Sequence, residues 1–305
     1  MRCSLASMSS RSWLALVTFA CAACAAKTAP GWMASQPDGA SLDALTLPGT
    51  HDTMALYEPA AGTAQAQTMN LADQYAAGIR YVDIRCVDVD DSFGIYHGPE
   101  YEKASFDDVI ATTLQFLDDH PTETIVMSVK QEADNNGATQ SFEATFDGYV
   151  AEQPDRWYTN DSVPTLGEAR GNIVLLRRFD AVMTPLGIDG STWADNTTFT
   201  LTNADSTLRI EDNYIVADPA TKWMQITSLF DEAKAGDPAT LYLTYTSGYE
   251  LVGVLDNIPD VSMPIDQMLD TYFADPANAH AHLGVVAMDM VTADRVGTLA
   301  AFNAQ

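Results

Sequence analysis

Short apolar runs alternate with amphipathic stretches along most of the chain. The runs are rich in Val, Ile and Leu, and several are almost continuously apolar, which is typical of strands buried on both faces. They predict strands over residues 43–50, 81–89, 93–98, 123–132, 171–179, 208–216, 240–248 and 283–291.

The stretches between these runs predict helices. Residues 105–121 place an apolar residue every three or four positions, between an N-cap at Ser105 and a closing Pro121, and residues 221–236 and 264–275 follow the same pattern. Alternating strands and helices predict a parallel sheet. The length of the chain and the number of strands favour a closed or nearly closed β/α barrel over an open doubly wound sheet, and no Gly-rich phosphate loop follows the first strand.

The N-terminal residues depart from this pattern. An apolar run too short to cross a bilayer follows two arginines, which predicts a secretory signal peptide over residues 1–26. Cys24 lies in an imperfect lipoprotein processing site, so secretion and lipid anchoring to the cell envelope through Cys24 remain two open predictions. Residues 27–40 are predicted to be a linker, and residues 41–305 a single barrel domain.

The acidic composition limits the partners. A formal net charge of −27 argues against nucleic acid and against electrostatic adhesion to anionic membranes. Without the signal peptide, Cys86 is the single remaining cysteine unless Cys24 is kept as an anchor, which excludes a disulfide framework. We take a monomer as the default.

Titratable side chains gather at the ends of the predicted strands, where barrels of this kind carry their chemistry. A charged residue in an apolar strand costs free energy unless it is paired. Taken singly, each could be a hydrogen-bonded core histidine, an ion-pair partner or a helix cap, but their shared position at one rim favours a functional site. These residues are His51, Asp52, Asp83, Arg85, His97, Lys130, Arg178 and Asp289.

The residue types favour phosphoryl transfer without a metal. Zinc or a harder cation is the alternative, but His51 and His97 lack a close ligand spacing and Arg85 lies among the acids. A planar guanidinium pairs well with phosphate oxygens. Two histidines, each near a carboxylate, can serve as base and acid. We therefore expect no metal and no cofactor.

An ordered series of short segments extends from about Leu45 to Asp289. In order, these are LPGTHDT, GIRYVDIR, IYHG, HPTETIVMSVKQE, LGEARGNIVLLRRF, WADNTTFT and AMDM. Together they resemble the X-domain of bacterial phosphatidylinositol-specific phospholipase C. The resemblance implies a single α/β domain with a distorted, incompletely closed TIM-type (β/α) barrel. It also implies an exported, metal-independent enzyme that cleaves phosphatidylinositol in membranes, with glycosylphosphatidylinositol as a further candidate substrate.

The resemblance assigns a role to the rim residues by position. His51, oriented by Asp289, would take the proton from the inositol 2-hydroxyl, whose attack on phosphorus gives inositol 1,2-cyclic phosphate and diacylglycerol. His97, helped by Asp52, would protonate the departing diacylglycerol oxygen. Arg85 would hold the non-bridging phosphate oxygens.

The resemblance also assigns contacts to the inositol ring. Relatives usually carry a stacking aromatic residue shortly after the Asp195 position, where this chain has Thr197-Thr198-Phe199, so we expect Phe199 or Tyr245 to take that place. The residues expected to contact the inositol are Lys130, Arg178, Asp195 and Gly98.

Asp83 is expected to support His97 or Arg85. Calcium-dependent relatives place acidic ligands near this arginine's position, whereas the sequence around Arg85 follows the calcium-independent bacterial pattern. Two moderately apolar loops, residues 55–62 and 248–257, are candidates for contact with the bilayer.

Two alternatives of other classes stay open. A non-catalytic inositol-lipid-binding module would keep the barrel and lose a histidine, and both His51 and His97 are present. A metal-dependent barrel phosphodiesterase with another head-group specificity would need an acidic cluster on the first strands, where Arg85 lies.

Overall fold

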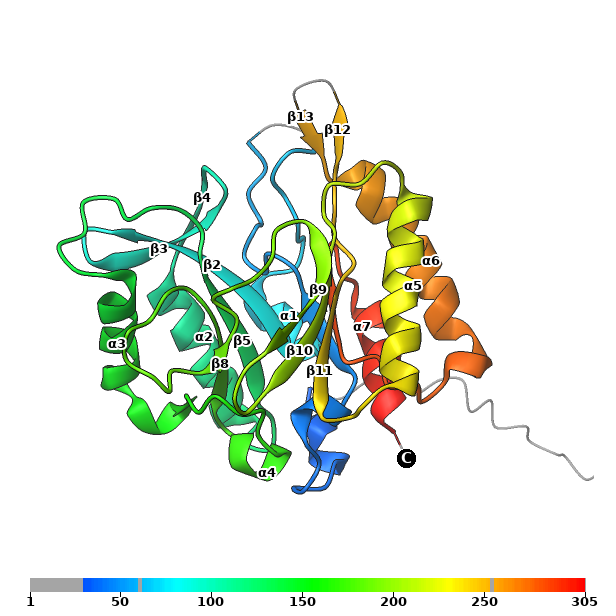
Figure 1. Ribbon diagram of the computed structural model, residues 1–305, viewed down its shortest axis with the longest axis horizontal. Coiled ribbons are helices and arrows are strands. Elements are labelled where there is room, and N and C mark those ends of the chain that lie inside the picture. The colour runs from blue at the N-terminus through cyan, green and yellow to red at the C-terminus, as the bar shows by residue number, and fades with distance from the viewer. Residues whose placement is uncertain (1–29, 60–61, 253–254, 305) are drawn as a thin grey trace, which may run out of the picture.

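A single curved sheet occupies the centre of the molecule (Figure 1). The computed structural model describes residues 30–59, 62–252 and 255–304. The main strands follow the order β6-β7-β5-β2-β1-β14-β11-β10-β9, and all neighbours in this order are parallel except β9 and β10. Within the described residues no ladder joins β6 to β9, so the predicted incompletely closed barrel is confirmed.

The strands differ in length and in place. The parallel strands are β1 (Leu47–Thr50), β2 (Tyr81–Val89), β5 (Ile125–Gln131), β6 (Trp157–Tyr158), β7 (Ile173–Arg178), β8 (Ile188–Asp189), β10 (Thr207–Asp212), β11 (Thr240–Tyr245) and β14 (Val285–Met288). The antiparallel strands are β3 (Ser92–His97) beside β2, β4 (Glu100–Ser105) beside β3, β9 (Thr197–Thr202) at the sheet edge, and the hairpin β12 (Glu250–Val252) and β13 (Leu255–Asn257).

Helices cover two sides of the sheet. In Figure 1, α2 and α3 lie at the left, and α5, α6 and α7 lie at the right. The α-helices are α1 (Leu71–Ala77), α2 (Phe106–Asp119), α3 (Phe142–Glu152), α4 (Leu166–Ala169), α5 (Pro219–Ala235), α6 (Pro259–Ala274) and α7 (Ala293–Ala300). The 3-10 helices are η1 (Trp32–Ser35), η2 (Leu42–Ala44), η3 (Pro154–Arg156), η4 (Pro276–Asn278) and η5 (Ala301–Asn303).

The interior of the barrel is apolar at its base, where the parallel strands begin, and charged at its rim, where they end. Side chains alternate along each strand, so residues two apart share a face. On β2, Tyr81 packs inside the barrel, Asp83 and Arg85 follow on the same face, and Val82 and Ile84 pack between the sheet and the helices. The other strands fill the interior with Leu47, Val126, Val174, Leu176, Leu208, Ile210, Leu241, Leu243, Val285 and Ala287.

The predicted elements are present with shifted ends. Each predicted strand run contains a strand, and the predicted helices correspond to α2, α5 and α6. Helix α6 begins at Pro259, earlier than predicted, and continues through Pro264. The edge strand β9 was not predicted, because its Thr-rich, half-exposed sequence lacks the apolar run of a buried strand.

Residues 30–40 are the described part of the predicted linker, and Trp32 in this segment packs against the base of the barrel. Trp32 is buried, and its Nε1 donates to the carbonyl oxygen of Gly78 at 3.0 Å. The predicted signal peptide over residues 1–26 and Cys24 lie outside the described residues. In the part of the chain that the structure describes, the helices are all too short or too polar to cross a bilayer.

A fully buried ion pair fastens the base of the barrel. Arg80, directly before β2, donates through Nη2 to Glu123 Oε2 at 2.8 Å and through Nη1 to the carbonyl oxygen of Ile79 at 2.7 Å. Glu123 also accepts from the backbone N–H of Met33 at 3.1 Å. Removing one partner of such a pair leaves the other charge buried and unpaired, which costs about 3–5 kcal/mol.

We therefore expect Arg80→Met to lower the free energy of unfolding, measured by urea denaturation, by about 3–5 kcal/mol. Adding Glu123→Gln should recover part of that loss, because the amide removes the buried charge and still accepts from Met33. A single variant that loses less than about 1 kcal/mol would contradict this expectation. So would a double variant no more stable than the single one.

Candidate active site

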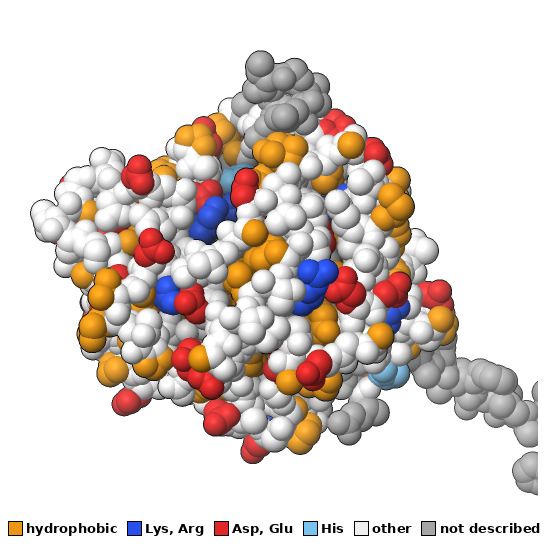
Figure 2. Space-filling model, viewed as in Figure 1, with side chains coloured by type: hydrophobic (Ala, Val, Ile, Leu, Met, Phe, Trp, Pro, Cys, Tyr) orange, Lys and Arg blue, Asp and Glu red, His pale blue; other side chains and the backbone are white. Residues whose placement is uncertain are grey.

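The rim of the barrel is hollowed into a cavity of about 420 Å³. In Figure 2, a histidine lies among acidic and basic side chains in the upper part of the visible face. The cavity is lined by residues at or just beyond the ends of β1, β2, β3, β5, β7, β10 and β14 and in the segments before β9 and β12. They include His51, Arg85, His97, Gly98, Lys130, Glu132, Arg178, Trp193, Asp195, Asp212, Tyr214, Tyr249 and Asp289.

His51 and Asp289 come from the adjacent strands β1 and β14 and form one pair. The backbone N–H of His51 donates to the carbonyl oxygen of Met288 at 3.0 Å, and His51 Nδ1 lies 2.8 Å from Asp289 Oδ1. On the other side of the ring, Nε2 lies 2.8 Å from Arg85 Nη2. Because a guanidinium only donates, Nε2 must accept, which places the proton of the neutral ring on Nδ1, toward Asp289.

The surroundings of His51 favour a role as a general base. Burial lowers the pKa of His51, but the carboxylates of Asp289 and Asp52 together outweigh it, so the pKa is raised above its ordinary value even though Arg85 opposes the change. A ring whose unprotonated Nε2 faces a cavity has the form that a general base needs.

His97, at the end of β3, and Asp52, just after β1, form the second pair. His97 Nδ1 lies 2.7 Å from the carbonyl oxygen of Ala64 and therefore carries a proton, while Nε2 faces Asp52 Oδ2 at 3.6 Å. Asp52 is almost fully buried, and neither of its carboxylate oxygens has a hydrogen-bond partner among the described residues. Burial raises the pKa of Asp52 against the charges of Arg85 and His97. Such a carboxyl beside an imidazole suits proton donation.

The Arg85 guanidinium lies between the two pairs. It donates through Nε and Nη2 to Asp83 Oδ2 at 3.2 and 3.1 Å, and its Nη1 lies 3.3 Å from Asp52 Oδ2 and 3.6 Å from Glu132 Oε1. Burial alone would lower the pKa of Arg85, but these carboxylates outweigh it and raise the pKa well above its ordinary value. Burial likewise acts to raise the pKa of Asp83, but Arg85 and Arg178 hold it well below its ordinary value. The site thus holds a fixed cation beside an ionised carboxylate.

A second ion pair lines the wall beside His97. Lys130 Nζ lies 2.6 Å from Glu132 Oε2, and the backbone N–H of Gly98 donates to Glu132 Oε1 at 2.9 Å. Burial and the Arg85 charge lower the pKa of Lys130. Burial raises the pKa of Glu132, but Arg85 and Lys130 outweigh it and lower the pKa to about 2. Glu132 was not predicted, although it lies two positions beyond Lys130 on the same face.

The opposite wall carries Arg178 at the end of β7. Its guanidinium lies 3.8 Å from the centroid of the Trp193 ring, a cation–π contact, and Trp193 Nε1 donates to Asp212 Oδ2 at 2.9 Å. Asp212 was not predicted either. It follows Leu208 and Ile210 at intervals of two on β10, so the alternation that fills the core also directs Asp212 into the cavity.

Asp195 lies at the exposed edge of the cavity, where it accepts a hydrogen bond from Tyr214 Oη. The backbone around Tyr214 is held by Asn196 Oδ1, which accepts from the N–H groups of Tyr214 and Ile215 at 2.9 and 2.8 Å. Asp195 and Tyr214 therefore form one wall of the mouth.

Neither of the two aromatic residues expected near the inositol, Phe199 and Tyr245, lines the cavity. Tyr245 is fully buried in the barrel interior, where its Oη lies 2.6 Å from Tyr81 Oη. Phe199 lies on the edge strand β9 and packs edge-on against Trp193, outside the lining of the cavity. The aromatic side chains that line the cavity are Trp193, Tyr214 and Tyr249.

The structure brings all the predicted site residues to this one cavity or to the shell directly around it. Of the two partners predicted for Asp83, the structure shows Arg85. The roles assigned to these residues remain predictions.

The structure also bears on possible metal ligands. Among the described residues, no three His, Cys, Asp or Glu side chains are grouped so that they could hold a metal ion.

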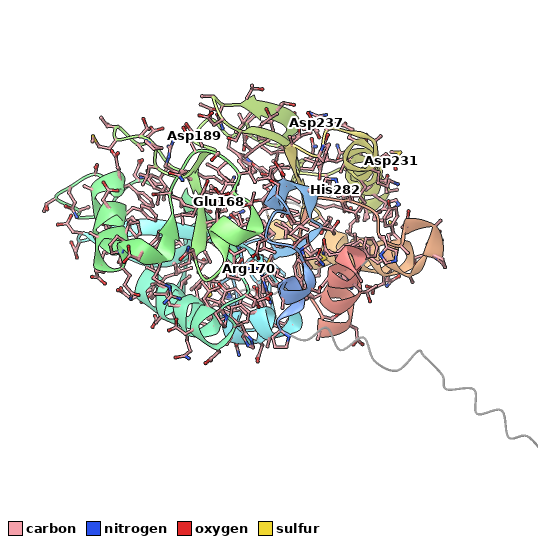
Figure 3. The ribbon with its side chains drawn as sticks, turned by 90° about the horizontal axis from the view of Figure 1, so that it is seen from below. Glu168, Arg170, Asp189, Asp231, Asp237 and His282 are labelled. Atoms are coloured by element: carbon pink, nitrogen blue, oxygen red, sulfur yellow. The ribbon has the colours of Figure 1, made fainter. Side chains whose placement is uncertain are left out.

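His282 lies at the base of the barrel, which Figure 3 shows from below. Its Nδ1 and Nε2 lie 3.1 and 2.8 Å from the carbonyl oxygens of Ala233 and Asp43, so this histidine links three segments of the base.

Known proteins resemble this chain in sequence. A family model described as phosphatidylinositol-specific phospholipase C, X domain, matches residues 49–179. The 1-phosphatidylinositol phosphodiesterase of Listeria monocytogenes is 34% identical over 235 residues, which cover 73% of this chain and 70% of that protein. The protein of the same name from Staphylococcus aureus strain Newman is 31% identical over 203 residues, covering 62% of this chain and 65% of that protein.

Solved structures share the architecture. A variant of the phosphatidylinositol-specific phospholipase C from Staphylococcus aureus has a TM-score of 0.82 and 26% identity, covering 91% of this chain and 99% of that one. The phosphatidylinositol-specific phospholipase C from Listeria monocytogenes has a TM-score of 0.73 and 27% identity, covering 90% and 99%. Because the Listeria relative is matched over 70% of its own length at 34% identity, and the fold agrees, this chain belongs to the bacterial phosphatidylinositol-specific phospholipase C family.

Proposed function

We propose that the protein is an exported phospholipase C that cleaves phosphatidylinositol without a metal ion. The observation that carries this proposal is the placement of two histidine–carboxylate pairs, His51 with Asp289 and His97 with Asp52, on either side of the Arg85 guanidinium. A base, an acid and a fixed cation are the groups needed to move a phosphoryl group to a neighbouring hydroxyl. The relatives from Listeria and Staphylococcus are named for action on the same lipid.

The proposed reaction begins at His51 Nε2. When the phosphodiester enters the cavity, its non-bridging oxygens compete for Arg85, which frees Nε2 to take the proton of the inositol 2-hydroxyl. The 2-oxygen then bonds to phosphorus while the bond from phosphorus to the diacylglycerol oxygen breaks. His97, which carries a proton on both ring nitrogens before this step, gives its Nε2 proton to that oxygen. The products are diacylglycerol and inositol 1,2-cyclic phosphate.

Arg85 takes the place of a metal ion in this reaction. Asp83 and Asp52 hold its guanidinium before substrate binds, so the charge that stabilises the transition state needs no reorganisation. The planar fork of the guanidinium can hold two phosphate oxygens at once. This arrangement supports the prediction of a calcium-independent enzyme with no cofactor.

The head group is proposed to be inositol without further phosphates. Lys130 faces Glu132, and Arg178 faces Asp83 and Asp212, so these cations are already balanced by carboxylates. Glycosylphosphatidylinositol remains a further candidate substrate. The residues proposed to contact the inositol are Lys130, Arg178, Asp195 and Gly98, to which the geometry adds Glu132, Asp212 and Tyr214.

The proposed substrate lies in a membrane, so contact with the bilayer would be peripheral and transient. The segments proposed to contact the bilayer are residues 55–62 and 248–257, of which 60–61 and 253–254 lie outside the described residues. The second segment contains the hairpin β12–β13, and its Tyr249 lines the cavity. The signal peptide would export the protein, with secretion and anchoring through Cys24 as the two routes. A monomer suffices, because all the proposed roles fall on one chain. The net charge of −27 makes a nucleic-acid partner unfavourable.

Phosphorus NMR of the purified mature protein with phosphatidylinositol micelles and EDTA tests the reaction. We expect the resonance of the cyclic phosphodiester to appear. We expect His51→Ala and His97→Ala each to lower the rate by about 10²–10⁴-fold, the usual contribution of a positioned base or acid. Circular dichroism of both variants controls for folding.

Two results of this experiment would contradict the proposal. Turnover that requires added calcium would mean that acidic residues of the cavity bind a metal. No turnover with or without calcium would favour an inositol-lipid-binding module or a phosphodiesterase for another head group.

The pH dependence tests the role of Asp289. His51 acts as a base only when its ring is neutral, so kcat/KM should rise as the pH rises through the His51 pKa. Asp289 raises that pKa, whereas burial and Arg85 lower it. Asp289→Asn should therefore move the acid limb of the kcat/KM profile to lower pH, while the maximal kcat falls because the ring is less well oriented. An acid limb that stays in place or moves to higher pH would disprove the pairing.

A further inference from the structure

Gln67 is a fully buried residue that the proposed reaction does not use and that lies outside the lining of the cavity. Its Nε2 donates to the carbonyl oxygens of His51 and Met288, both at 2.8 Å. Its Oε1 accepts from the backbone N–H of Val291 at 3.4 Å. One amide therefore spans the C-terminal ends of β1 and β14, the two strands that carry the proposed base and its carboxylate.

The place of Gln67 follows from where the ladder between these strands ends. The last backbone hydrogen bond runs from the His51 N–H to the Met288 carbonyl oxygen. Beyond it, Asp52 and Met290 have φ angles of 38° and 42°, a left-handed backbone that no strand adopts. The backbone hydrogen bonds that would fix the spacing of β1 and β14 thus stop at His51 and Asp289, the residues proposed to act as the base and its partner. The side chain of Gln67 joins the two strand ends there by hydrogen bonds to the carbonyl oxygens of His51 and Met288.

The segment that carries Gln67 extends this link to the proposed acid. The carbonyl oxygen of Ala66 accepts from the Met290 N–H at 2.8 Å, and that of Ala64 accepts from His97 Nδ1 at 2.7 Å. The backbone N–H groups of Ala66 and Gln67 both donate to the carbonyl oxygen of Ala55 at 3.0 Å. Residues 64–67 therefore contact the strand ends that carry His51 and Asp289, and also the ring of His97.

We propose that Gln67 is a positioning residue that holds the ends of β1 and β14 together, so that His51 Nδ1 stays within hydrogen-bonding distance of Asp289. This inference rests on the proposed function, because it gives Gln67 a part in the same reaction. An amide fits the position because its single nitrogen offers two N–H donors to two carbonyl oxygens. Neither an ionised carboxylate nor a thioether has a donor to offer.

A positioning role and a purely structural role predict different results. If Gln67 only satisfies buried carbonyl groups, its loss should lower stability and leave the catalysis of the folded protein unchanged. If Gln67 positions His51 and Asp289, its loss should lower kcat in protein that is still folded. It should also weaken the effect of Asp289 on the His51 ring.

Gln67→Met separates the two roles, because methionine keeps the length and packing of the side chain and removes both donors. We expect kcat on phosphatidylinositol micelles to fall about 10²-fold, the effect of displacing a reacting group by about 1 Å. We expect KM to change less than kcat. The acid limb of kcat/KM should move to lower pH, because His51 loses part of the field of Asp289.

Gln36→Met is the matched control. Gln36 is also buried and donates through Nε2 to the carbonyl oxygen of Asn303 at 2.8 Å, at the base of the barrel away from the cavity. We expect this variant to lose stability and to keep the kcat and the pH profile of the wild type. Circular dichroism and urea denaturation of both variants show which fraction of each is folded.

The inference is overturned if folded Gln67→Met has the kcat and pH profile of Gln36→Met. If Gln67→Met does not fold, Gln67→Leu decides the matter in the same terms against Gln36→Leu, because leucine is shorter, stays uncharged and offers no donor. A wild-type protein with no turnover of phosphatidylinositol would remove the proposed function together with this inference. A fully active wild type with an unaffected Gln67 variant would remove this inference alone.

Discussion

The Arg85 guanidinium is a largely buried cation, and the site is arranged around the need to balance it. It faces Asp52, Asp83 and Glu132 and reaches Nε2 of His51. Each of these carboxylates would be costly to bury alone, and Arg85 would be costly to bury without them. The same charges shift the pKa values of His51, Asp83 and Glu132. The ion pairing that stabilises the rim and the acid–base chemistry proposed for it therefore belong to one network.

This network is built by the same strand alternation that forms the core. On β2, the face that buries Tyr81 in the interior presents Asp83 and Arg85 nearer the rim. The inward face thus changes from apolar to charged along β2, β5, β7, β10 and β14. At the rim, the ladder between β1 and β14 gives way to the left-handed residues Asp52 and Met290. Side-chain hydrogen bonds replace backbone ones there, and functional groups from distant parts of the chain can converge.

The barrel and most of the cavity were predictable, because long apolar runs identify buried strands and charged residues within them mark the rim. Asp212 and Glu132 were missed because an acidic residue at a strand end resembles a surface residue, unless the two-residue period is continued past the apolar part. Tyr245 could not be placed from the sequence, since only the structure shows that it is buried in the barrel interior. No sequence pattern predicts the contacts of Gln67, because its hydrogen-bond acceptors are backbone carbonyl groups, one of them 221 residues away.

The proposed reaction requires that His51 keep its proton on Nδ1 and leave Nε2 free. Nitrogen-15 NMR of the histidine-labelled protein measures this most directly, because protonated and unprotonated ring nitrogens have different chemical shifts, and a comparison with His51→Ala assigns the signals. Above the His51 pKa, the spectrum should show a protonated Nδ1 and an unprotonated Nε2 for this ring, with full protonation setting in at a pH above the ordinary histidine value. A His51 ring with its proton on Nε2 would contradict the proposed reaction, because that nitrogen could not accept the proton of the inositol 2-hydroxyl.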